Sequence, residues 1–193
     1  MSRYSLTTRI ATSEDATILA ELWCDVLRRA DRAEQVTDLE LVIKASAASA
    51  EERTVVVEYD GQVAGAVHLR ITTLSPINLE PCVQSIHPRV LLPLRGHGVG
   101  HALMDAAASY AEENGILHVV AAVPNGSRDA NRFMAKLGLA PAVMYRVGPT
   151  SLLRSRVSRQ RPQRGGDGAR SKVLATRRSL RRARAEKALD PED

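Results

Sequence analysis

The chain has 193 residues, 44% of them apolar, and a formal net charge of +5 at pH 7. This length is enough for one domain with a hydrophobic core, and no apolar run approaches the ~20 residues that span a bilayer. The first residues are polar and give no secretion signal, so we expect a cytoplasmic protein without a transmembrane segment. Two cysteines, Cys24 and Cys82, lack the spacing of a metal site, so we expect no bound metal and two buried, reduced thiols.

The charge is divided unevenly along the chain. Residues 1–149 hold 14 Lys and Arg against 17 Asp and Glu, a net charge of −3, whereas residues 150–193 hold 13 against 5, a net charge of +8. We therefore expect one globular domain over residues 1–149 and a basic tail over residues 150–193 that is disordered or only marginally helical. The tail is either a solvated extension or a contact for nucleic acid, another polyanion or an anionic membrane, held by charge without sequence specificity.

The first fifty residues predict a strand followed by two helices. Residues 7–11 form a weak strand pattern, and apolar residues then recur at helical spacing to about Arg29 and again to about Ser49. Two capping pairs mark the predicted helix starts: Thr12 with Asp15, and Thr37 with Glu40.

A hairpin and a third strand are predicted next. Residues 54–59 are rich in β-branched side chains, and Asp60-Gly61 is a two-residue hairpin signal. Residues 63–72 alternate between two faces, as a returning strand does. A further strand is predicted over residues 82–92, with a bulge near Pro88, which cannot donate a hydrogen bond to a neighbouring strand.

A glycine-rich turn follows this strand directly. The apolar residues Val90-Leu91-Leu92 lead into Arg95-Gly96-His97-Gly98-Val99-Gly100, and helical spacing begins at once. In a strand, glycine turn and helix of this kind, backbone N–H groups and the helix N-terminus point at a phosphate. We therefore expect the turn to hold a pyrophosphate; the alternative is a connecting turn without a ligand.

The rest of the domain predicts two helices and two strands. The helix that begins at the glycine turn continues to about Asn114, and a short strand of buried type follows over residues 117–123. A second helix is predicted over residues 128–137 and a last strand over residues 142–147. This order predicts an α/β domain of the α+β kind, with one mixed sheet and helices on both of its faces.

The motif Arg95-x-x-Gly98-x-Gly100, between an apolar strand and a helix, resembles the acetyl-coenzyme A signature of the GNAT superfamily of N-acetyltransferases. The element order resembles that fold from about Ser5 to Val147, and residues 131–139 resemble the late helix of the family. The resemblance implies that acetyl-coenzyme A is the cosubstrate and that its acetyl group passes to a primary amine by direct attack on the thioester. The amine would belong to a small molecule, an amino acid, or a protein N-terminus or lysine.

The resemblance also implies a cofactor site. The pantetheine arm would pair with the strand at residues 90–92, in the gap to the next strand, and a backbone N–H near Leu91 or Leu92 would stabilise the oxyanion. Asn125 and Asn131 would hydrogen-bond the arm, or are ordinary polar groups of a loop and a helix. The implied cofactor-binding residues are Val90, Leu91, Leu92, Arg95, Gly96, His97, Gly98, Val99, Gly100, Asn125 and Asn131.

The proton-transfer groups are less clear. The family often places a tyrosine, as proton donor, four residues before the late-helix glycine, where this chain has Met134. Tyr145 is a possible substitute, whereas Tyr110 falls on an apolar helix stripe and is more consistent with a core position. Three residues on or beside the strands that would face the acceptor are candidate bases: Glu80, His87 and His68. Each has a purely structural alternative, and a water relay is equally open.

Met134 also motivates an alternative function. The domain could bind acyl-coenzyme A as a sensor or scaffold with little or no turnover, while the basic tail contacts nucleic acid or another polyanion. The sequence leaves the amine acceptor and the oligomeric state open.

Overall fold

The computed structural model describes residues 5–123, 126–143 and 146–160. Contacts divide the chain into a first unit, Met1–Ala140, and a second, Pro141–Asp193. The elements of the first unit are β1 (Leu6–Ile10), the 3-10 helix η1 (Ser13–Asp15), α1 (Ala16–Leu22), α2 (Arg32–Ala48), β2 (Glu52–Tyr59), β3 (Gln62–Thr73), β4 (Pro81–Val90), η2 (Leu92–Leu94), α3 (Val99–Glu113), β5 (His118–Ala121) and α4 (Arg128–Lys136). In the second unit, the described residues include α5 (Thr150–Gln160).

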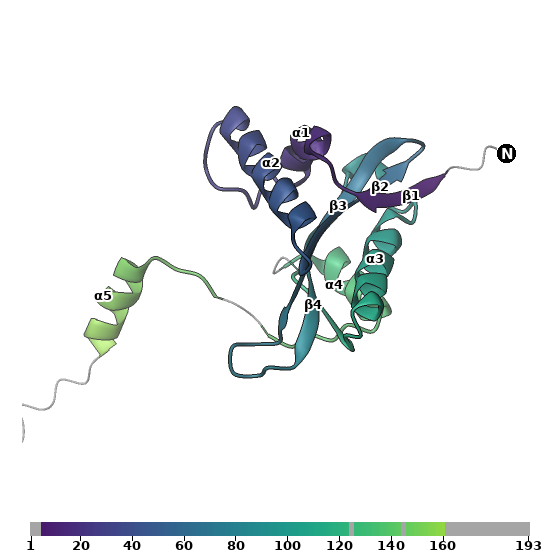
Figure 1. The fold of residues 1–193 in the computed structure, drawn as a ribbon. Helices are drawn as coiled ribbons and strands as arrows, with labels where there is room; N and C mark the ends of the chain where they lie inside the picture. The colour runs from purple at the N-terminus through teal and green to yellow at the C-terminus, as the bar shows by residue number, and fades with distance from the viewer. Residues whose placement is uncertain (1–4, 124–125, 144–145, 161–193) are drawn as a thin grey trace, which may run out of the picture. The chain divides into compact units, whose positions relative to one another are not determined.

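The sheet contains five strands whose spatial order, β1-β2-β3-β4-β5, follows their order in the chain. Figure 1 labels the first four of them. The first four strands are antiparallel neighbours, and β5 lies parallel to β4. The β2–β3 hairpin turns at Asp60 and Gly61, both with positive φ, as the Asp-Gly signal predicts. The mixed sheet expected from the sequence is therefore confirmed.

Helices cover both faces of this sheet (Figure 1). On one face α3 contacts β2, β3 and β4, and Leu69 and Leu103 are fully buried in a shared core. On the other face α1 and α2 pack around Val56, with Leu19 and Leu39 in the same apolar cluster. Because successive strand residues point to opposite faces, one sheet supplies side chains to two separate cores.

Both N-terminal helices differ from the prediction at one end. α1 ends at Leu22 rather than near Arg29, because Trp23 leaves helical geometry with φ −107° and ψ +14°. α2 begins before the predicted cap: Asp31 is the N-cap residue, and Thr37 lies inside the helix. The predicted start was therefore wrong, because an Asp immediately before the helix was the stronger cap.

The C-terminal part departs further from the prediction. The described residues of the range 142–147 lie outside the sheet, and Val143 is 75% and Val147 100% exposed. The described residues of this range form no strand because they bury little surface. In the tail, which we expected to be disordered or only marginally helical, the described residues form α5 over Thr150–Gln160. The domain boundary between residues 149 and 150 stays a prediction.

The two cysteines differ in their surroundings. Both are free, but Cys24 is exposed while Cys82 is buried, so the expectation that both are buried is wrong for Cys24. Burial raises the pKa of the Cys82 thiol. Within the described ranges, no three His, Cys, Asp or Glu side chains gather as a metal site would require. In that same part of the chain, every helix is too short or too polar to cross a bilayer.

Candidate functional site

β4 and β5 run side by side only over the first part of β4. Their paired residues extend from Cys82 with His118 to Ser85 with Ala121. β4 then continues to Val90 without a neighbour on that side among the described residues. An unpaired strand edge offers N–H and C=O groups to a ligand that pairs with backbone, and this edge lies where the resemblance implies a gap.

A bulge interrupts β4 where this unpaired stretch begins. The register with β3 shifts there, and His87 has a φ of +47°, which is uncommon for a residue other than glycine. The indole Nε1 of Trp23 donates a hydrogen bond to the main-chain oxygen of His87 (2.8 Å). The bulge predicted near Pro88 is therefore confirmed, and the residue that ends α1 is attached to it.

The His87 ring lies near a pair of opposite charges. Burial lowers the pKa of His87, the positive charge of Arg89 lowers it further, and Asp25 acts in the opposite direction. The ring is therefore neutral at pH 7 and able to accept a proton. Arg89 Nη2 binds Asp25 Oδ2 (2.5 Å), while the buried Nε of Arg89 has no hydrogen-bond partner among the described residues.

The end of β4 corrects one detail of the predicted oxyanion site. The amide of Leu91 donates to the carbonyl of Ala64 (2.8 Å), so it is not available to a ligand. Because hydrogen bonding alternates along an antiparallel strand, the N–H and C=O of Val90 point away from β3, toward the gap. The strand ends in η2, where Leu92 is 72% exposed.

The glycine turn has the geometry of a phosphate cradle. Gly96 and Gly98 have φ values of +81° and +86°, which side chains rarely tolerate, and Gly98 is the N-cap of α3. A Cβ on Gly98 would lie 3.2 Å from Leu6 Cδ1. The amide of Ala102 bonds to Gly98 O, so the amides of the three preceding residues have no partner in the helix. These amides and the positive end of the helix dipole suit a pyrophosphate.

Aromatic side chains border this turn, in contacts that no pattern in the sequence predicts. The His97 ring meets Tyr59 edge-on at 5.2 Å between centroids, and His101 meets Phe133 edge-on at 5.1 Å. A Cβ on Gly100 would lie 3.4 Å from Phe133 Cζ. The ring of Phe133 therefore brings α4 into contact with the first turn of α3. A strand–turn–helix motif in the sequence does not predict this contact.

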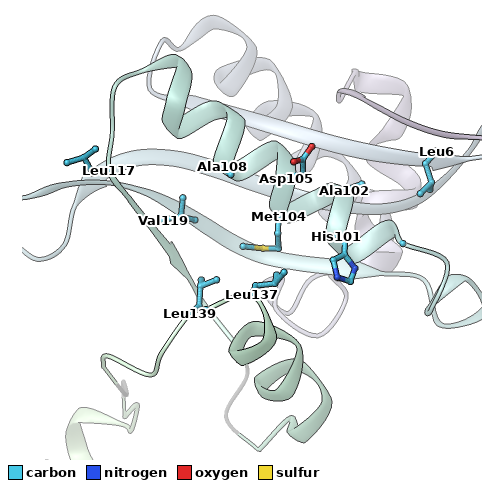
Figure 2. A pocket seen from close by; sticks show the side chains of 12 residues that line it. Leu6, His101, Ala102, Met104, Asp105, Ala108, Leu117, Val119, Leu137 and Leu139 are labelled. Carbon is cyan, nitrogen blue, oxygen red and sulfur yellow. The ribbon is translucent and has the colours of Figure 1, made fainter.

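A hollow of about 850 Å³ extends along α3 from the glycine turn (Figure 2). Figure 2 shows His101 toward one end and Leu117 toward the other, with Leu139 below the helix. Gly98 also belongs to the lining, and most of the lining is apolar. The turn is thus open to a ligand larger than a phosphate group.

The structure separates the predicted catalytic residues. Glu80 precedes β4 and faces His118 at 3.7 Å, and both side chains are about half exposed. It lies seven residues from His87, roughly 20 Å along a strand, so it does not reach the bulge. Tyr145 lies outside the described residues. Tyr110 is 2% exposed and donates to a main-chain carbonyl, which confirms the core position that its pattern favoured.

The two predicted asparagines and the methionine of the late helix have different outcomes. Asn125 lies outside the described residues. The amide nitrogen of Asn131 donates to Ser127 O at the start of α4 (2.8 Å), which is a local helix contact. Met134 is 6% exposed, so the position where a tyrosine was looked for is filled by a buried thioether.

A mixed sheet whose parallel strands part beside a glycine turn and a helix N-terminus is the arrangement that the resemblance to N-acetyltransferases predicted. The sequence profile of the acetyltransferase (GNAT) family matches residues 17–139, more than half of the chain. The chain therefore belongs to the acetyltransferase (GNAT) family. No curated protein matches the sequence significantly.

Solved structures agree with this fold. A transcriptional regulator from Bacillus halodurans C-125 is similar with a TM-score of 0.62 and 19% identity, over 75% of this chain and 99% of that one. An aminoglycoside N-acetyltransferase in complex with CoA has a TM-score of 0.61 and 14% identity, over 76% and 97%. A ribosomal-protein-alanine N-acetyltransferase from Brucella melitensis biovar Abortus 2308 has a TM-score of 0.58 and 20% identity, over 75% and 99%. At these identities the likeness establishes the fold.

Proposed function

We propose that this protein transfers an acetyl group from acetyl-coenzyme A to a primary amine, which attacks the thioester directly. The observation that carries the proposal is the left-handed turn at Gly96 and Gly98, placed at the N-terminus of α3 next to the unpaired edge of β4. When bound, acetyl-coenzyme A supplies an activated acetyl group. Residues of the chain would bind the cofactor, stabilise the oxyanion and transfer protons.

The cofactor is proposed to bind through main-chain groups. The amides of residues 96–100 would donate to the pyrophosphate, with the exposed Arg95 and His97 beside it. The polar main-chain groups of Val90 would pair with the pantetheine arm along the free edge of β4. Leu91, whose amide is already bonded to β3, would contribute through its position on the strand, and Leu92 through its exposed side chain.

The chemistry is proposed to take place at the bulge of β4. An outward amide at Val90 or Leu92 would stabilise the oxyanion. His87 would line the acceptor side with a neutral imidazole, and Tyr145 remains the proposed proton donor to the leaving thiolate. Glu80 is left out of this proposal because it lies at the opposite end of β4.

The acceptor is proposed only as a primary amine. Structures similar in fold carry names that include an aminoglycoside, a ribosomal-protein alanine and glucosamine 6-phosphate as acceptors. These acceptors share an amine and little else, which supports the reaction class without choosing among substrates.

Calorimetry with acetyl-coenzyme A tests the binding step. Saturable binding is expected, and Gly98→Glu should abolish it because a carboxylate and a strained turn replace the phosphate cradle. Gly115→Glu is the matched control, since Gly115 also has positive φ (+66°) but lies at the other end of α3. Absence of wild-type binding at millimolar cofactor would refute the proposal. An amine panel read by release of free thiol then identifies the acceptor.

The buried Met134 favours one alternative, an acyl-coenzyme A-binding sensor or scaffold with little turnover. Under that alternative, acetyl-coenzyme A binds and no amine in the panel releases thiol. Contact of the basic tail with nucleic acid or another polyanion is tested by deleting residues 155–193. Retention on heparin or DNA that is unchanged by the deletion would exclude that role.

A further inference from the structure

The bulge of β4 turns one arginine toward the face that carries α1 and α2. Between two paired positions, β4 has two residues, His87 and Pro88, where β3 has only Val67. Arg89 then stands opposite Ala66, which belongs to the apolar cluster of α1 and α2. Because cross-strand partners point to the same face, Arg89 points there as well. In a regular ladder, the Arg89 side chain would lie one position further along, on the face of α3.

The guanidinium of Arg89 is only partly used in this position. Its Nη2 binds one oxygen of Asp25, Oδ2, at 2.5 Å, whereas its Nε is buried and has no hydrogen-bond partner among the described residues. The Nε–H and one N–H of Nη2 point the same way and form an edge that a carboxylate can bind with both oxygens. Asp25 therefore uses half of this edge.

Two arginines with structural roles make use of their Nε atoms. Arg28 binds the two oxygens of Asp38 through Nε (2.6 Å) and Nη2 (3.3 Å). Arg9 donates from Nε to Glu58 (2.6 Å). In the described part of the chain, the Nε of Arg89 is the one side-chain polar atom that is buried without a partner, and such an atom is costly. A role as a link between β4 and the α1–α2 loop does not explain this cost.

We propose that Arg89 is the centre of a binding site for a small carboxylate, which displaces Asp25 and bonds to Nε and Nη2 with its two oxygens. In the free protein Asp25 stands in for the ligand, because it places the same chemical group on the same nitrogen. The Asp25 side chain is 59% exposed and that of Arg89 21%, so Asp25 can leave for water while the guanidinium stays in place.

This site adjoins the edge that we assigned to the cofactor, since Val90 directly follows Arg89. One consequence rests on the acetyl transfer proposed above. A ligand held by Arg89 would then be an acceptor amine that also carries a carboxylate, as amino acids do. The carboxylate site itself does not depend on turnover and is tested first.

Nitrogen–proton NMR spectra of the arginine Nε–H groups test binding in the free protein. The Arg89 signal is assigned by its loss in Arg89→Lys. Sodium acetate, exchanged for sodium chloride at constant ionic strength, should shift the Arg89 Nε proton downfield until the site is saturated, while the Arg28 signal stays unchanged. The absence of a shift would overturn the proposal, and so would an equal response to inorganic phosphate.

Variants test the displacement. Asp25→Asn removes the internal competitor, so acetate should bind about fivefold more tightly. Arg89→Lys keeps the charge but not the two-point edge, so binding should weaken at least tenfold. Asp38→Asn and Arg28→Lys are matched controls, because they make the same changes in an exposed pair and should alter nothing. Unchanged affinity in Asp25→Asn would overturn the proposal even if Arg89→Lys failed to fold.

Kinetics test the acceptor class. With acetyl-coenzyme A, kcat/KM for alanine should exceed that for alaninamide at least tenfold, and Arg89→Lys should abolish this preference while Arg28→Lys keeps it. An active wild type without the preference would overturn the acceptor assignment. A wild type that binds acetate at Arg89 but acetylates no amine would overturn the proposed transfer and leave the carboxylate site established.

Discussion

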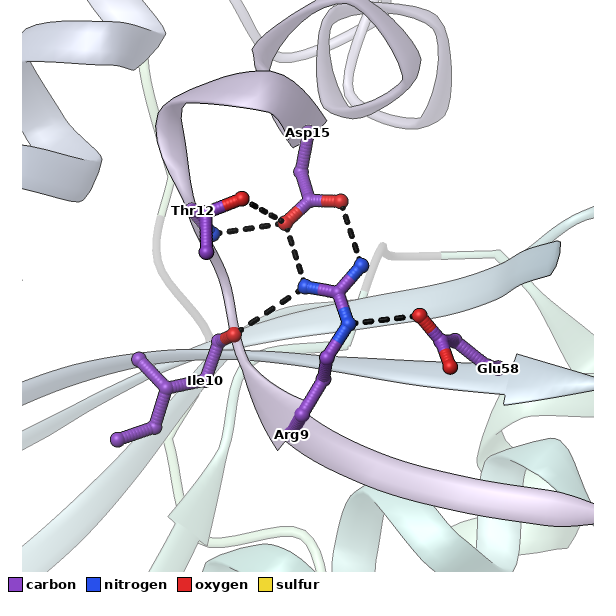
Figure 3. Close-up of polar contacts among 5 residues, drawn as sticks. All are labelled: Arg9, Ile10, Thr12, Asp15 and Glu58. Atoms are coloured by element: carbon purple, nitrogen blue, oxygen red, sulfur yellow. Dashed lines mark hydrogen bonds and ion pairs between the residues drawn. The ribbon is translucent and has the colours of Figure 1, made fainter. Parts of the chain in front are cut away.

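Replacing Asp15 with Asn should remove a large part of the stability of the junction between β1 and α1. Asp15 is 5% exposed and accepts hydrogen bonds from Arg9 Nη1 (2.7 Å), Arg9 Nη2 (2.8 Å) and the Thr12 amide (2.7 Å), as Figure 3 shows. The Thr12–Asp15 pair thus acts as the predicted helix start. Arg9 also binds Glu58 on β2 (2.6 Å), so this guanidinium joins β1 to Asp15 in η1 and to Glu58 in β2.

The size of the effect follows from these contacts. A hydrogen bond to a charged group contributes about 1.5–3 kcal/mol, and Asp15 accepts two from one guanidinium. In the variant, the Asn side chain still offers one oxygen as an acceptor, and Arg9 still pairs with Glu58 and reaches water. The loss of stability is therefore smaller than the sum of the two hydrogen-bond energies. We expect Asp15→Asn to lower the free energy of unfolding by about 2 kcal/mol, out of the ~5–15 kcal/mol typical of a domain.

The effect should depend on pH in one direction. The Arg9 guanidinium holds the pKa of Asp15 below its ordinary value of 3.8. Because the folded pKa is lowered, the carboxylate contributes its full stability above the unfolded pKa of about 3.9, and this contribution is lost as the pH falls through the folded pKa. The difference between wild type and Asp15→Asn should therefore be constant from pH 5 to 8 and shrink below about pH 4.

Urea unfolding followed by tryptophan fluorescence measures this difference, because Trp23 is the one tryptophan of the chain and is 5% exposed. Asp38→Asn is the matched control: Asp38 also binds an arginine through both oxygens, Arg28, but at the surface, so its loss should matter far less. Equal destabilisation by the two variants, or a difference that persists undiminished at pH 3, would show that the reasoning is wrong.

Three further predictions concern the core. Gly65→Ala should destabilise the protein by about 1–3 kcal/mol in urea, because the new Cβ would lie 2.7 Å from Arg89 O; an unchanged midpoint would contradict this packing. Trp23→Phe should cost about 1–2 kcal/mol by circular dichroism, since it leaves a bulge carbonyl without its donor, and no loss would mean that the bond contributes nothing. Iodoacetamide should label native protein once, at the exposed Cys24 and not at the buried Cys82, and mass spectrometry showing two adducts would refute the burial.

Local signals in the sequence predict most of the fold. Asp60-Gly61 marks a hairpin because few other residue pairs accept two positive φ values, and Gly115 ends α3 for a similar reason. The end of α1 could not be predicted, since apolar spacing continues past Leu22 while a contact between Trp23 and a distant strand ends the helix. Local patterns do not contain contacts that are made 64 residues away.

In the candidate site, too, the sequence predicts continuous motifs but not contacts between distant elements. The glycine turn is a continuous motif, so Gly96 and Gly98 were predicted with the ligand chemistry that their geometry suits. The hydrogen-bond chain through Ser46, Thr54 and His68 joins α2, β2 and β3. The sequence offered His68 as a candidate base, but nothing in it pointed to Ser46 or Thr54 as partners of that ring. Only the register of β2 with β3 brings the last two together.

The bulge of β4 is held from two sides, and this has a consequence for the cofactor edge. Trp23 donates to the carbonyl of His87 from the face that carries α1, while Gly65 leaves room for the carbonyl of Arg89 from the face that carries α3. The two carbonyls that flank the bulge are thus positioned by the core before any ligand binds.

Val90 follows the bulge, and its amide points toward the gap from a strand that the core already holds in place. A ligand that pairs with this amide would therefore require little reorganisation of the protein. The loop between α1 and α2 is different, because its residues are mostly exposed and it is joined to β4 by the ion pair of Asp25 and Arg89. If the amine binds at the β4 bulge as proposed, we expect changes in that loop to alter which amine binds while the edge of β4 keeps its geometry.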